Sequence, residues 1–225
     1  MSYLPSHLKQ SIAVWSINLP DHQEQTPTYL DGLSQDERQR AEKFLKPADA
    51  NRFILCRGLL RQILADYLNC HPSTLKFERT EQGKPFLRSQ ELDFNISHSC
   101  DRLLIAVTSG SAVGIDIEFK RENMNITGIA KRWFSGPEQA FLQTLSQPVD
   151  GFFEIWAKKE AYSKAVGCGI YNELSRFSVP LGEPPGSPIL GSDGQWFFQS
   201  LTIDSAYAAA VVSVAPPVPV NVHTL

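Results

Sequence analysis

GIDIE, at residues 114–118, is the segment from which the fold can be worked out. Apolar and acidic residues alternate along it, which is the pattern of a short β-strand. Side chains two positions apart on a strand point to the same side, so we expect Asp116 and Glu118 to project together. Neighbouring carboxylates repel each other unless a cation lies between them, and oxygen ligands of this kind suit a hard divalent ion such as Mg²⁺.

A second segment, WAKKEAYSK at residues 156–164, is predicted to be helical. It can bring a third carboxylate, Glu160, toward the strand, with Lys164 one turn further along the same helix face. Each segment alone also has a simpler interpretation. Asp116 and Glu118 could form a solvated strand face, and Glu160 and Lys164 could be a helix-stabilising pair worth roughly 0.2–0.5 kcal/mol. Together they predict a magnesium site beside a lysine, which suits phosphate chemistry.

Two further segments support the phosphate interpretation. GKP at residues 83–85 predicts a turn, and FNISHS at residues 94–99 predicts a strand that ends in a polar turn with Ser97, His98 and Ser99 at its tip. A single histidine is more often a surface residue than a ligand. Because a lysine turn and two charged segments accompany it, His98 becomes a candidate donor to phosphate.

In the order GKP, FNISHS, GIDIE and WxxKEAxxK, these segments resemble the Sfp-type 4′-phosphopantetheinyl transferases of the holo-carrier-protein synthase superfamily. The resemblance covers nearly the whole chain. It implies an α+β fold, a pseudo-dimer of two similar α/β halves with the active site in the cleft between them. Residues 1–111 would bind the nucleotide side of coenzyme A. Residues 112–225 would contain the metal strand, the catalytic helix and a segment that docks the carrier protein.

Internal similarity along the chain agrees with two alike halves. A strand at residues 12–17, a capping box that starts at Ser34, a long helix at 47–69 and a strand at 103–109 each recur roughly 104 positions later. The tail after Pro216 is expected to be irregular. Shorter synthases of this superfamily form the same cleft by trimerising, so the length of this chain implies a monomer.

The resemblance also implies roles for individual residues. The metal ligands would be Asp116, Glu118 and Glu160, and Glu160 also matches the proposed general base. Lys164 and His98 would take part in catalysis at the phosphates. The residues that bind coenzyme A would be Arg40, Arg52, Lys84, Pro85, Ser97, His98, Lys159 and Lys164. Some relatives carry a lysine where this chain has Glu37, and Arg38 could substitute for it.

The implied reaction moves the 4′-phosphopantetheine arm of coenzyme A to a serine of an apo acyl, polyketide or peptidyl carrier protein and releases adenosine 3′,5′-bisphosphate. Mg²⁺ would be the cofactor. Segment 119–134, in which basic and apolar residues interleave, would dock an acidic carrier. Within it, Met124 is expected to face the partner, whereas Trp133 could equally face the core of the protein.

Two other functions stay open at this point. One is a Mg²⁺-dependent nucleotide or phosphoester hydrolase built on the same carboxylates, and the other is a non-catalytic module that binds coenzyme A or a carrier protein. The sequence contains neither a Walker loop nor a GxSxG nucleophile elbow. An ATP-driven kinase and a serine hydrolase are therefore disfavoured.

The composition is that of an ordinary soluble globular protein, because 42% of the 225 residues are hydrophobic and 20% are charged. A net charge of −3 argues against nucleic acid or an anionic membrane as a partner. No apolar run approaches the roughly 20 residues of a membrane span, and the first residues do not resemble a signal peptide. A cytoplasmic protein with four reduced cysteines is therefore expected.

Overall fold

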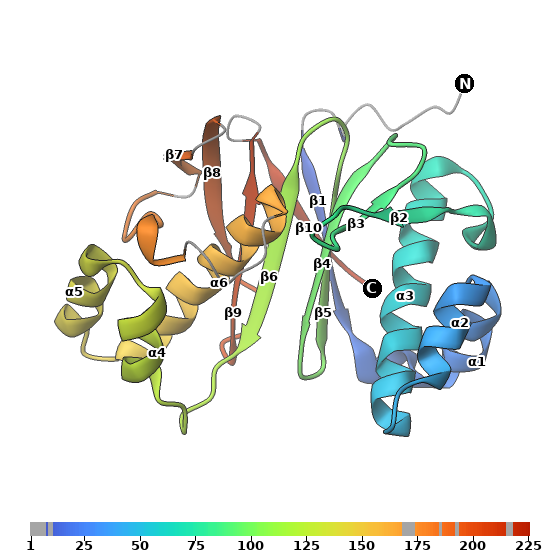
Figure 1. Cartoon of the computed structure of the whole chain (residues 1–225), viewed down its shortest axis with the longest axis horizontal. Coiled ribbons are helices and arrows are strands. Elements are labelled where there is room, and N and C mark those ends of the chain that lie inside the picture. The colour runs from blue at the N-terminus through green and yellow to red at the C-terminus, as the bar shows by residue number, and fades with distance from the viewer. Residues whose placement is uncertain (1–7, 9–10, 168–173, 185, 192–193, 215–217) are drawn as a thin grey trace.

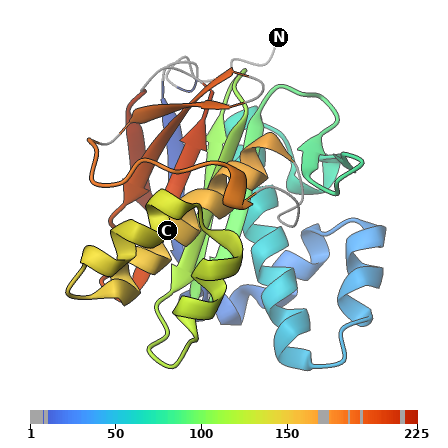
Figure 2. The same ribbon diagram turned by 60° about the vertical axis from the view of Figure 1, so that its left-hand side comes forward.

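The computed structural model describes all residues except 1–7, 9–10, 168–173, 185, 192–193 and 215–217. Two α/β halves lie side by side, with their sheets in the middle and their helices on the outer sides (Figure 1). The turned view shows α4–α6 stacked in front of the sheets (Figure 2). The chain therefore has the predicted α+β architecture of two similar halves.

In the first half, strand β1 is followed by the helices and then by the remaining strands. Its elements are β1 (Ile12–Asn18), η2 (Leu19–Gln25), α1 (Thr26–Gly32), α2 (Gln35–Glu42), α3 (Pro47–Leu68), η3 (Pro72–Thr74), β2 (Phe77–Arg79), β3 (Pro85–Leu87), β4 (Asp93–Ser99) and β5 (Arg102–Thr108). The second half contains β6 (Val113–Phe119), α4 (Ile126–Trp133), α5 (Gly136–Thr144), α6 (Pro148–Val166), η4 (Leu174–Arg176), β7 (Ser187–Gly191), β8 (Gly194–Leu201) and β9 (Tyr207–Ser213), and β10 (Val220–Thr224) follows.

The strand order shows how the halves correspond. One sheet has the order β10-β1-β5-β4, the other has the order β6-β9-β8-β7, and β2 and β3 form a separate hairpin. Ile12 and Val113 begin equivalent strands 101 positions apart, and Pro47 and Pro148 begin equivalent helices at the same offset. β5 and β9 begin 105 positions apart. The repeat is confirmed, with an offset close to the predicted one.

The core consists of three apolar layers, one within each half and one between them. α3 packs on the outer face of the first sheet, and α6 packs on the outer face of the second. Between the sheets lies a third cluster of small and β-branched side chains, among them Val14 and Ala106 of the first half and Ile115 and Val211 of the second. Burial of this shared face makes the two sheets one core, because apolar area removed from water stabilises their contact.

Both predicted capping boxes are present. Ser34 and Ser135 share the same backbone angles, φ −67° and ψ 162°, and each serine oxygen accepts the amide N–H of the glutamate three positions on. Each glutamate then also binds the long helix of its half. Glu37 pairs with Arg57 and Arg61 of α3, and Glu138 pairs with a lysine of α6.

Two expectations about the strands are wrong. β4 does not end before Ser97, because its pairing with β5 continues to the partners Ser99 and Arg102. The tail is not irregular after Pro216: Val220–Thr224 forms β10, which pairs in parallel with β1. The tail therefore returns to the sheet of the first half, where His223 stacks on the ring of Trp15.

The structure also describes three of the four cysteines and the apolar character of the helices. Cys56, Cys70 and Cys100 are free thiols, and Cys168 lies outside the described residues. In the described part of the chain, no helix combines the length and the apolar character needed to cross a membrane.

Candidate active site

The predicted carboxylates meet where the two halves join. Asp116 and Glu118 project from β6 on the same side, as the alternation predicts, and each accepts a hydrogen bond from a serine of β4. Glu160 lies on α6, which covers the second sheet, and is 6% exposed, while Asp116 is 3% exposed. Three acidic side chains are thus largely removed from water at one junction.

Lys164 supplies a positive charge to this carboxylate cluster, which consists of Asp116, Glu118 and Glu160. Its ammonium donates to Oδ1 of Asp116 at 2.6 Å and to Oγ of Ser97 at 2.8 Å. The other oxygen of Asp116, Oδ2, is buried and has no hydrogen-bond partner among the described residues. A buried carboxylate oxygen without a donor is costly, so this position favours a further cation.

Burial and repulsion between carboxylates raise the pKa values of the two glutamates of the cluster. Burial, and then the charge of Asp116, raise the pKa of Glu160 to about 7, with Glu118 adding to the effect and Lys164 opposing it. Burial followed by the charge of Asp116 also raises the pKa of Glu118. One lysine therefore does not neutralise three carboxylates, and the surplus negative charge remains in a poorly solvated place.

The residues of the cluster fit a hard divalent cation, because they offer only carboxylate oxygens and leave one of these unpartnered. They are not already arranged around a single point: no three His, Cys, Asp or Glu side chains of the described residues are placed to ligate one ion. Binding would require small side-chain rotations. Such rotations are open to Glu118 and Glu160, whose carboxylates end longer side chains than that of Asp116.

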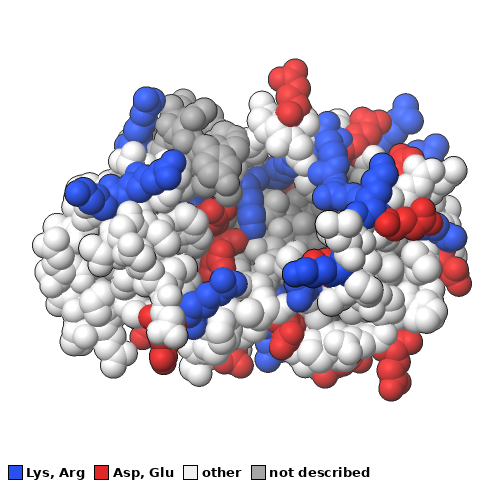
Figure 3. All heavy atoms as spheres, turned by 60° about the horizontal axis from the view of Figure 1, so that its bottom comes forward, with Lys and Arg blue, Asp and Glu red and all other residues white. Residues whose placement is uncertain are grey.

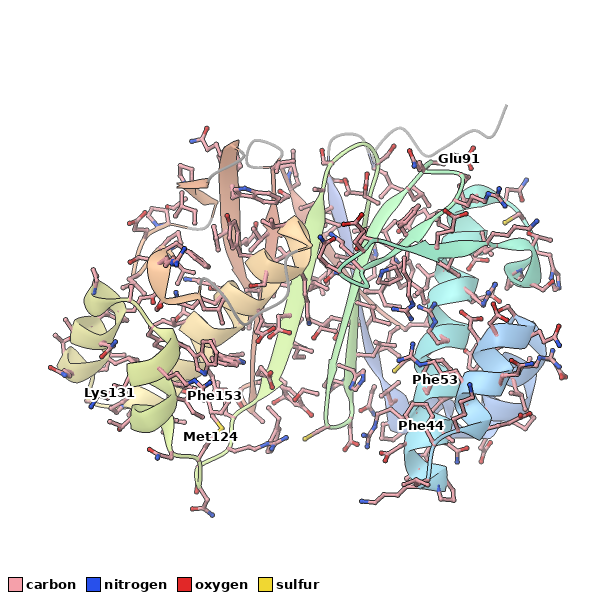
Figure 4. The ribbon with its side chains drawn as sticks, viewed as in Figure 1. Phe44, Phe53, Glu91, Met124, Lys131 and Phe153 are labelled. Atoms are coloured by element: carbon pink, nitrogen blue, oxygen red, sulfur yellow. The ribbon has the colours of Figure 1, made fainter. Side chains whose placement is uncertain are left out.

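An arginine-lined cavity of about 390 Å³ lies on the other face of β4. It is lined by Arg40, Phe44, Asp49, Arg52, Phe53, Cys56, Arg57, Arg79, Ile96 and His98. Figure 3 shows a hollow between the halves with Lys and Arg side chains gathered around it. Phe44 and Phe53 lie close together at the lower end of α3 (Figure 4), with ring centroids 5.5 Å apart. The cavity therefore combines positive charge with aromatic walls.

His98 lines this arginine cavity and interacts electrostatically with Lys164, the lysine of the carboxylate cluster. The side chain of His98 is exposed at the edge of the cavity, yet partial desolvation lowers its pKa, and the charges of Arg52 and Lys164 lower it further. A second cavity, of about 610 Å³, continues past Arg40, Arg57 and Arg79 to Pro85. An elongated anion could therefore contact basic groups from Lys164, past His98, to the arginines.

Comparison with known proteins supplies the family. Residues 112–212 match the sequence model of the 4′-phosphopantetheinyl transferase superfamily, and residues 19–110 match that of the N-terminal region of a 4′-phosphopantetheinyl transferase. The chain belongs to the 4′-phosphopantetheinyl transferase superfamily. It is therefore an enzyme of the phosphopantetheinyl transferase type, as the order of its motifs indicates.

Three relatives illustrate the similarity. The 4′-phosphopantetheinyl transferase HetI of Nostoc sp. is 35% identical over 210 residues, covering 91% of this chain and 88% of the relative. The phosphopantetheinyl transferase of Thraustochytrium sp. is 32% identical, covering 80% of this chain and 69% of the relative. The 4′-phosphopantetheinyl transferase Sfp of Bacillus subtilis is 29% identical, covering 90% of this chain and 92% of the relative.

In this transferase, two lysines predicted to bind coenzyme A make contacts within the protein. Lys159 is 0% exposed, and its ammonium is 2.9 Å from Glu138 and also donates to the carbonyl of Phe177. The Lys84 ammonium donates to the carbonyl oxygens of Val113 and Ala165, at 3.1 and 2.9 Å. Lys159 thus joins α6 to α5, and Lys84 joins the first half of the transferase to the second.

The basic residues around Glu37 also differ from the expectation. The guanidinium of Arg38, the expected substitute for the lysine of some relatives, donates to the carbonyls of Leu33 and Asp31. The positive charge beside Glu37 comes instead from Arg57 and Arg61, which form ion pairs with it at 3.0 and 2.7 Å. These contacts explain why an acidic residue is tolerated at this cavity.

Sequence reasoning missed two residues of the arginine cavity as candidate ligands. Arg57 and Arg79 line the cavity but are not among the coenzyme A ligands expected from the sequence. Arg79 lies on β2, four positions before Gly83, and lines both cavities. The available signal was a basic residue four positions before the GKP turn.

Lys84→Met is expected to lower the free energy of unfolding by about 2 kcal/mol, because two partly buried carbonyls lose their donor. For a chain of this size that corresponds to a Tm lower by about 6 °C, measurable by calorimetry. Lys76→Met, which removes an exposed lysine near the same hairpin, is the control and should leave Tm within about 1 °C. An unchanged Tm in Lys84→Met with a raised KM for coenzyme A would show that Lys84 binds the nucleotide instead.

Proposed function

We propose that this transferase moves the 4′-phosphopantetheine arm of coenzyme A to a serine hydroxyl of an apo carrier protein, with Mg²⁺ bound by Asp116, Glu118 and Glu160. The observation that carries the proposal is the position of the carboxylate cluster beside the arginine cavity, with Lys164 and His98 between them. When bound there, Mg²⁺ would neutralise charge on the pyrophosphate and on the leaving phosphate.

The residues of the chain have separate tasks in this reaction. Glu160 takes the proton of the serine hydroxyl as the serine oxygen attacks phosphorus, and in the metal-free protein burial and then the charge of Asp116 raise the pKa of this carboxyl to about 7. The bond from that phosphorus to the oxygen of adenosine 3′,5′-bisphosphate breaks, and Lys164 stabilises the negative charge left on the departing phosphate. Arg40, Arg52, Arg79 and His98 hold the nucleotide phosphates, and Pro85 lies beside the base.

The acceptor is expected to approach α4, which follows the metal strand. Lys131 and Arg132 are exposed on this helix, and Lys131 borders an apolar groove of about 360 Å³ between α4, α5 and the start of α6. Met124 is only partly exposed and packs near Phe153 (Figure 4), and Trp133 likewise packs partly against the second core. An acidic carrier with an apolar contact residue would complement this surface.

We further propose that the enzyme works as a cytoplasmic monomer without a nucleic-acid or membrane partner. A single chain supplies both sides of the site, since His98 comes from the first half and Glu160 from the second. The modest negative charge of the chain supports the absence of polyanionic partners. Size-exclusion chromatography with light scattering tests the oligomeric state, and a stable trimer would contradict it.

The proposed function is tested by intact-protein mass spectrometry of an apo acyl carrier protein incubated with the transferase, coenzyme A and Mg²⁺, beside an EDTA control. We expect the carrier to gain one phosphopantetheine only when metal is present. If acyl, polyketide and peptidyl carriers all stay unmodified while coenzyme A is cleaved, the protein is a hydrolase. If coenzyme A binds but stays intact, the protein is a binding module.

Metal binding is expected to weaken at acid pH. Since the pKa of Glu160 is raised to about 7, this carboxyl is mostly protonated at pH 6, and a cation must displace its proton. Affinity for Mn²⁺, measured by electron paramagnetic resonance, should fall roughly tenfold per pH unit below 7 and level off above it. Asp116, Glu118 and Lys164 face the same group, and a flat profile between pH 5 and 8 would contradict the assignment of Glu160.

Arg52→Ala is expected to raise the KM for coenzyme A roughly tenfold with little change in kcat, because a charged hydrogen bond to phosphate is worth about 1.5–3 kcal/mol. Arg52 is half-exposed and paired only loosely with Asp49, at 3.8 Å, so it is available to a ligand. Dephospho-coenzyme A, which lacks the 3′-phosphate, is the control. If its loss of activity relative to coenzyme A is equal in wild type and variant, Arg52 does not contact that phosphate.

A further inference from the structure

Along one edge of β6, the backbone N–H groups donate hydrogen bonds to side chains and not to the backbone of a neighbouring strand. β6 ends the order β6-β9-β8-β7, and on its free side it meets β4, which ends the other sheet. Within the described strands, no backbone ladder joins these two edges. Three side chains of β4 accept the amide N–H groups of every second residue of β6: Asn95 from Ile115 at 2.9 Å, Ser97 from Ile117 at 3.4 Å and Ser99 from Phe119 at 3.0 Å.

Two of these three side chains have an additional contact. A serine hydroxyl can accept one hydrogen bond and donate another. Ser97 donates to Oδ1 of Asp116 at 2.8 Å, and Ser99 donates to Oε2 of Glu118 at 3.3 Å. Each serine therefore binds a carboxylate and the amide of the residue that follows it. The amide oxygen of Asn95 cannot donate, and Gly114 offers no side chain at the equivalent position.

The two serines are well placed to restrict these carboxylates. Each is 7% exposed, so water does not easily replace the hydroxyl. Each hydroxyl is itself tied to the backbone of β6, so its position relative to the neighbouring carboxylate is restricted. The hydroxyl of Ser97 already has three partners, because Lys164 also donates to it, which leaves little capacity for a phosphate of coenzyme A.

We propose that Ser97 and Ser99 are positioning residues that hold the carboxylates of Asp116 and Glu118 in the orientation that binds the metal ion, an inference that rests on the proposed function. Partners of metal-ligating carboxylates of this kind typically matter 10–100-fold for metal affinity. The same contacts cross from one half to the other. The orientation of the metal ligands therefore depends on the correct apposition of the two halves.

Ser99→Ala tests the proposal, with Asn95→Ala as the matched control. Both variants lose a side-chain acceptor for one β6 amide, so both should lower Tm by a few degrees. Only Ser99→Ala also frees a carboxylate. In the absence of coenzyme A, we expect Mn²⁺ binding by electron paramagnetic resonance to weaken 10–100-fold in Ser99→Ala and to stay within about twofold of wild type in Asn95→Ala.

A second pair of variants controls for the possibility that Ser99→Ala loses affinity because it misfolds. Ser99→Thr keeps the hydroxyl, and Ser99→Val has the shape of the threonine variant without the hydroxyl. Wild-type-like Mn²⁺ affinity in Ser99→Thr and a loss in Ser99→Val would support the positioning role. Equal Mn²⁺ affinity in Ser99→Ala and Asn95→Ala, or in the Thr and Val variants, would overturn it.

Failure of the proposed function gives a different result. If the wild type binds no Mn²⁺, the metal assignment is wrong, and crystal structures of the metal-free proteins then decide the positioning role. A Glu118 carboxylate that turns away from its wild-type position in Ser99→Ala but not in Asn95→Ala would support it. A Glu118 carboxylate in the wild-type position in both variants would overturn it.

Discussion

Asp116→Ala is expected to lower kcat for carrier modification by about a thousandfold or more. Asp116 is the most buried carboxylate of the cluster, it anchors Lys164 at 2.6 Å, and it carries the unpartnered oxygen Oδ2. Its loss removes a proposed metal ligand and misplaces a lysine that would stabilise the leaving phosphate. Together these effects are worth about 4 kcal/mol of transition-state stabilisation, which corresponds to three factors of ten.

The fold should survive this substitution. Removing one of three mutually repelling carboxylates takes away the charge that, after burial, is the next largest cause of the raised pKa of Glu118 and Glu160. Lys164, whose side chain is 28% exposed, can be hydrated once its partner is gone. Mass spectrometry of the carrier measures the activity, circular dichroism measures the fold, and Asp66→Ala, at an exposed position of α3, is the control. Mg²⁺-dependent transfer by Asp116→Ala within tenfold of wild type would refute the metal assignment.

Gly114→Ala is expected to lower the free energy of unfolding more than Lys84→Met, Ser99→Ala or Asn95→Ala. A Cβ atom at this position of β6 would lie 2.0 Å from the carbonyl oxygen of Ala161 and 2.5 Å from the amide nitrogen of Ala165. Both are backbone atoms of α6, so no change of rotamer relieves the clash. The helix would have to move away from the sheet, at a cost of about 3 kcal/mol or more.

For a chain of this length the change corresponds to a Tm lower by about 10 °C, which differential scanning calorimetry would measure. Gly136→Ala is the matched control. Gly136 starts α5, no described atom lies within 4 Å of a Cβ built there, and alanine is the better helix former. The control should keep or slightly raise Tm. A Gly114→Ala variant as stable as the control would show that α6 does not pack against β6 at this distance.

Gly114 shows that the GIDIE motif also contains a residue needed for packing. In the sequence it is only the first letter of GIDIE, next to two acidic residues that attract attention. In the structure its missing side chain is what lets α6 approach β6 closely, and α6 is the helix that carries Glu160 and Lys164. Catalytic geometry and packing therefore depend on the same five residues.

The local elements could be predicted because their signals lie within a few positions of one another. A serine and a glutamate three residues apart predict each capping box, since both hydrogen bonds close within one turn. Alternation of apolar and acidic residues predicts β6 and the common side of Asp116 and Glu118. The order of four motifs then identifies the family, and with it the two-half architecture.

Contacts between distant segments could not be predicted in this way. Lys84 and Lys159 are adjacent to motif positions, yet their ammonium groups bind carbonyls 15 to 81 positions away. A lysine that binds a phosphate and a lysine that binds a carbonyl look alike in a sequence. Which of the two it is depends on the backbone that happens to lie within reach of the side chain.

The sequence by itself determined the family, the helices and strands around the site, and the residue types available for phosphate and metal chemistry. Only the tertiary structure decided that Arg79 faces the arginine cavity, that β10 completes the first sheet, and that Ser97 and Ser99 bind the carboxylates of β6. The physical reason is that propensity, capping and alternation act within a few residues. The apposition of β4 and β6 arises only when the apolar faces of the two sheets bury one another.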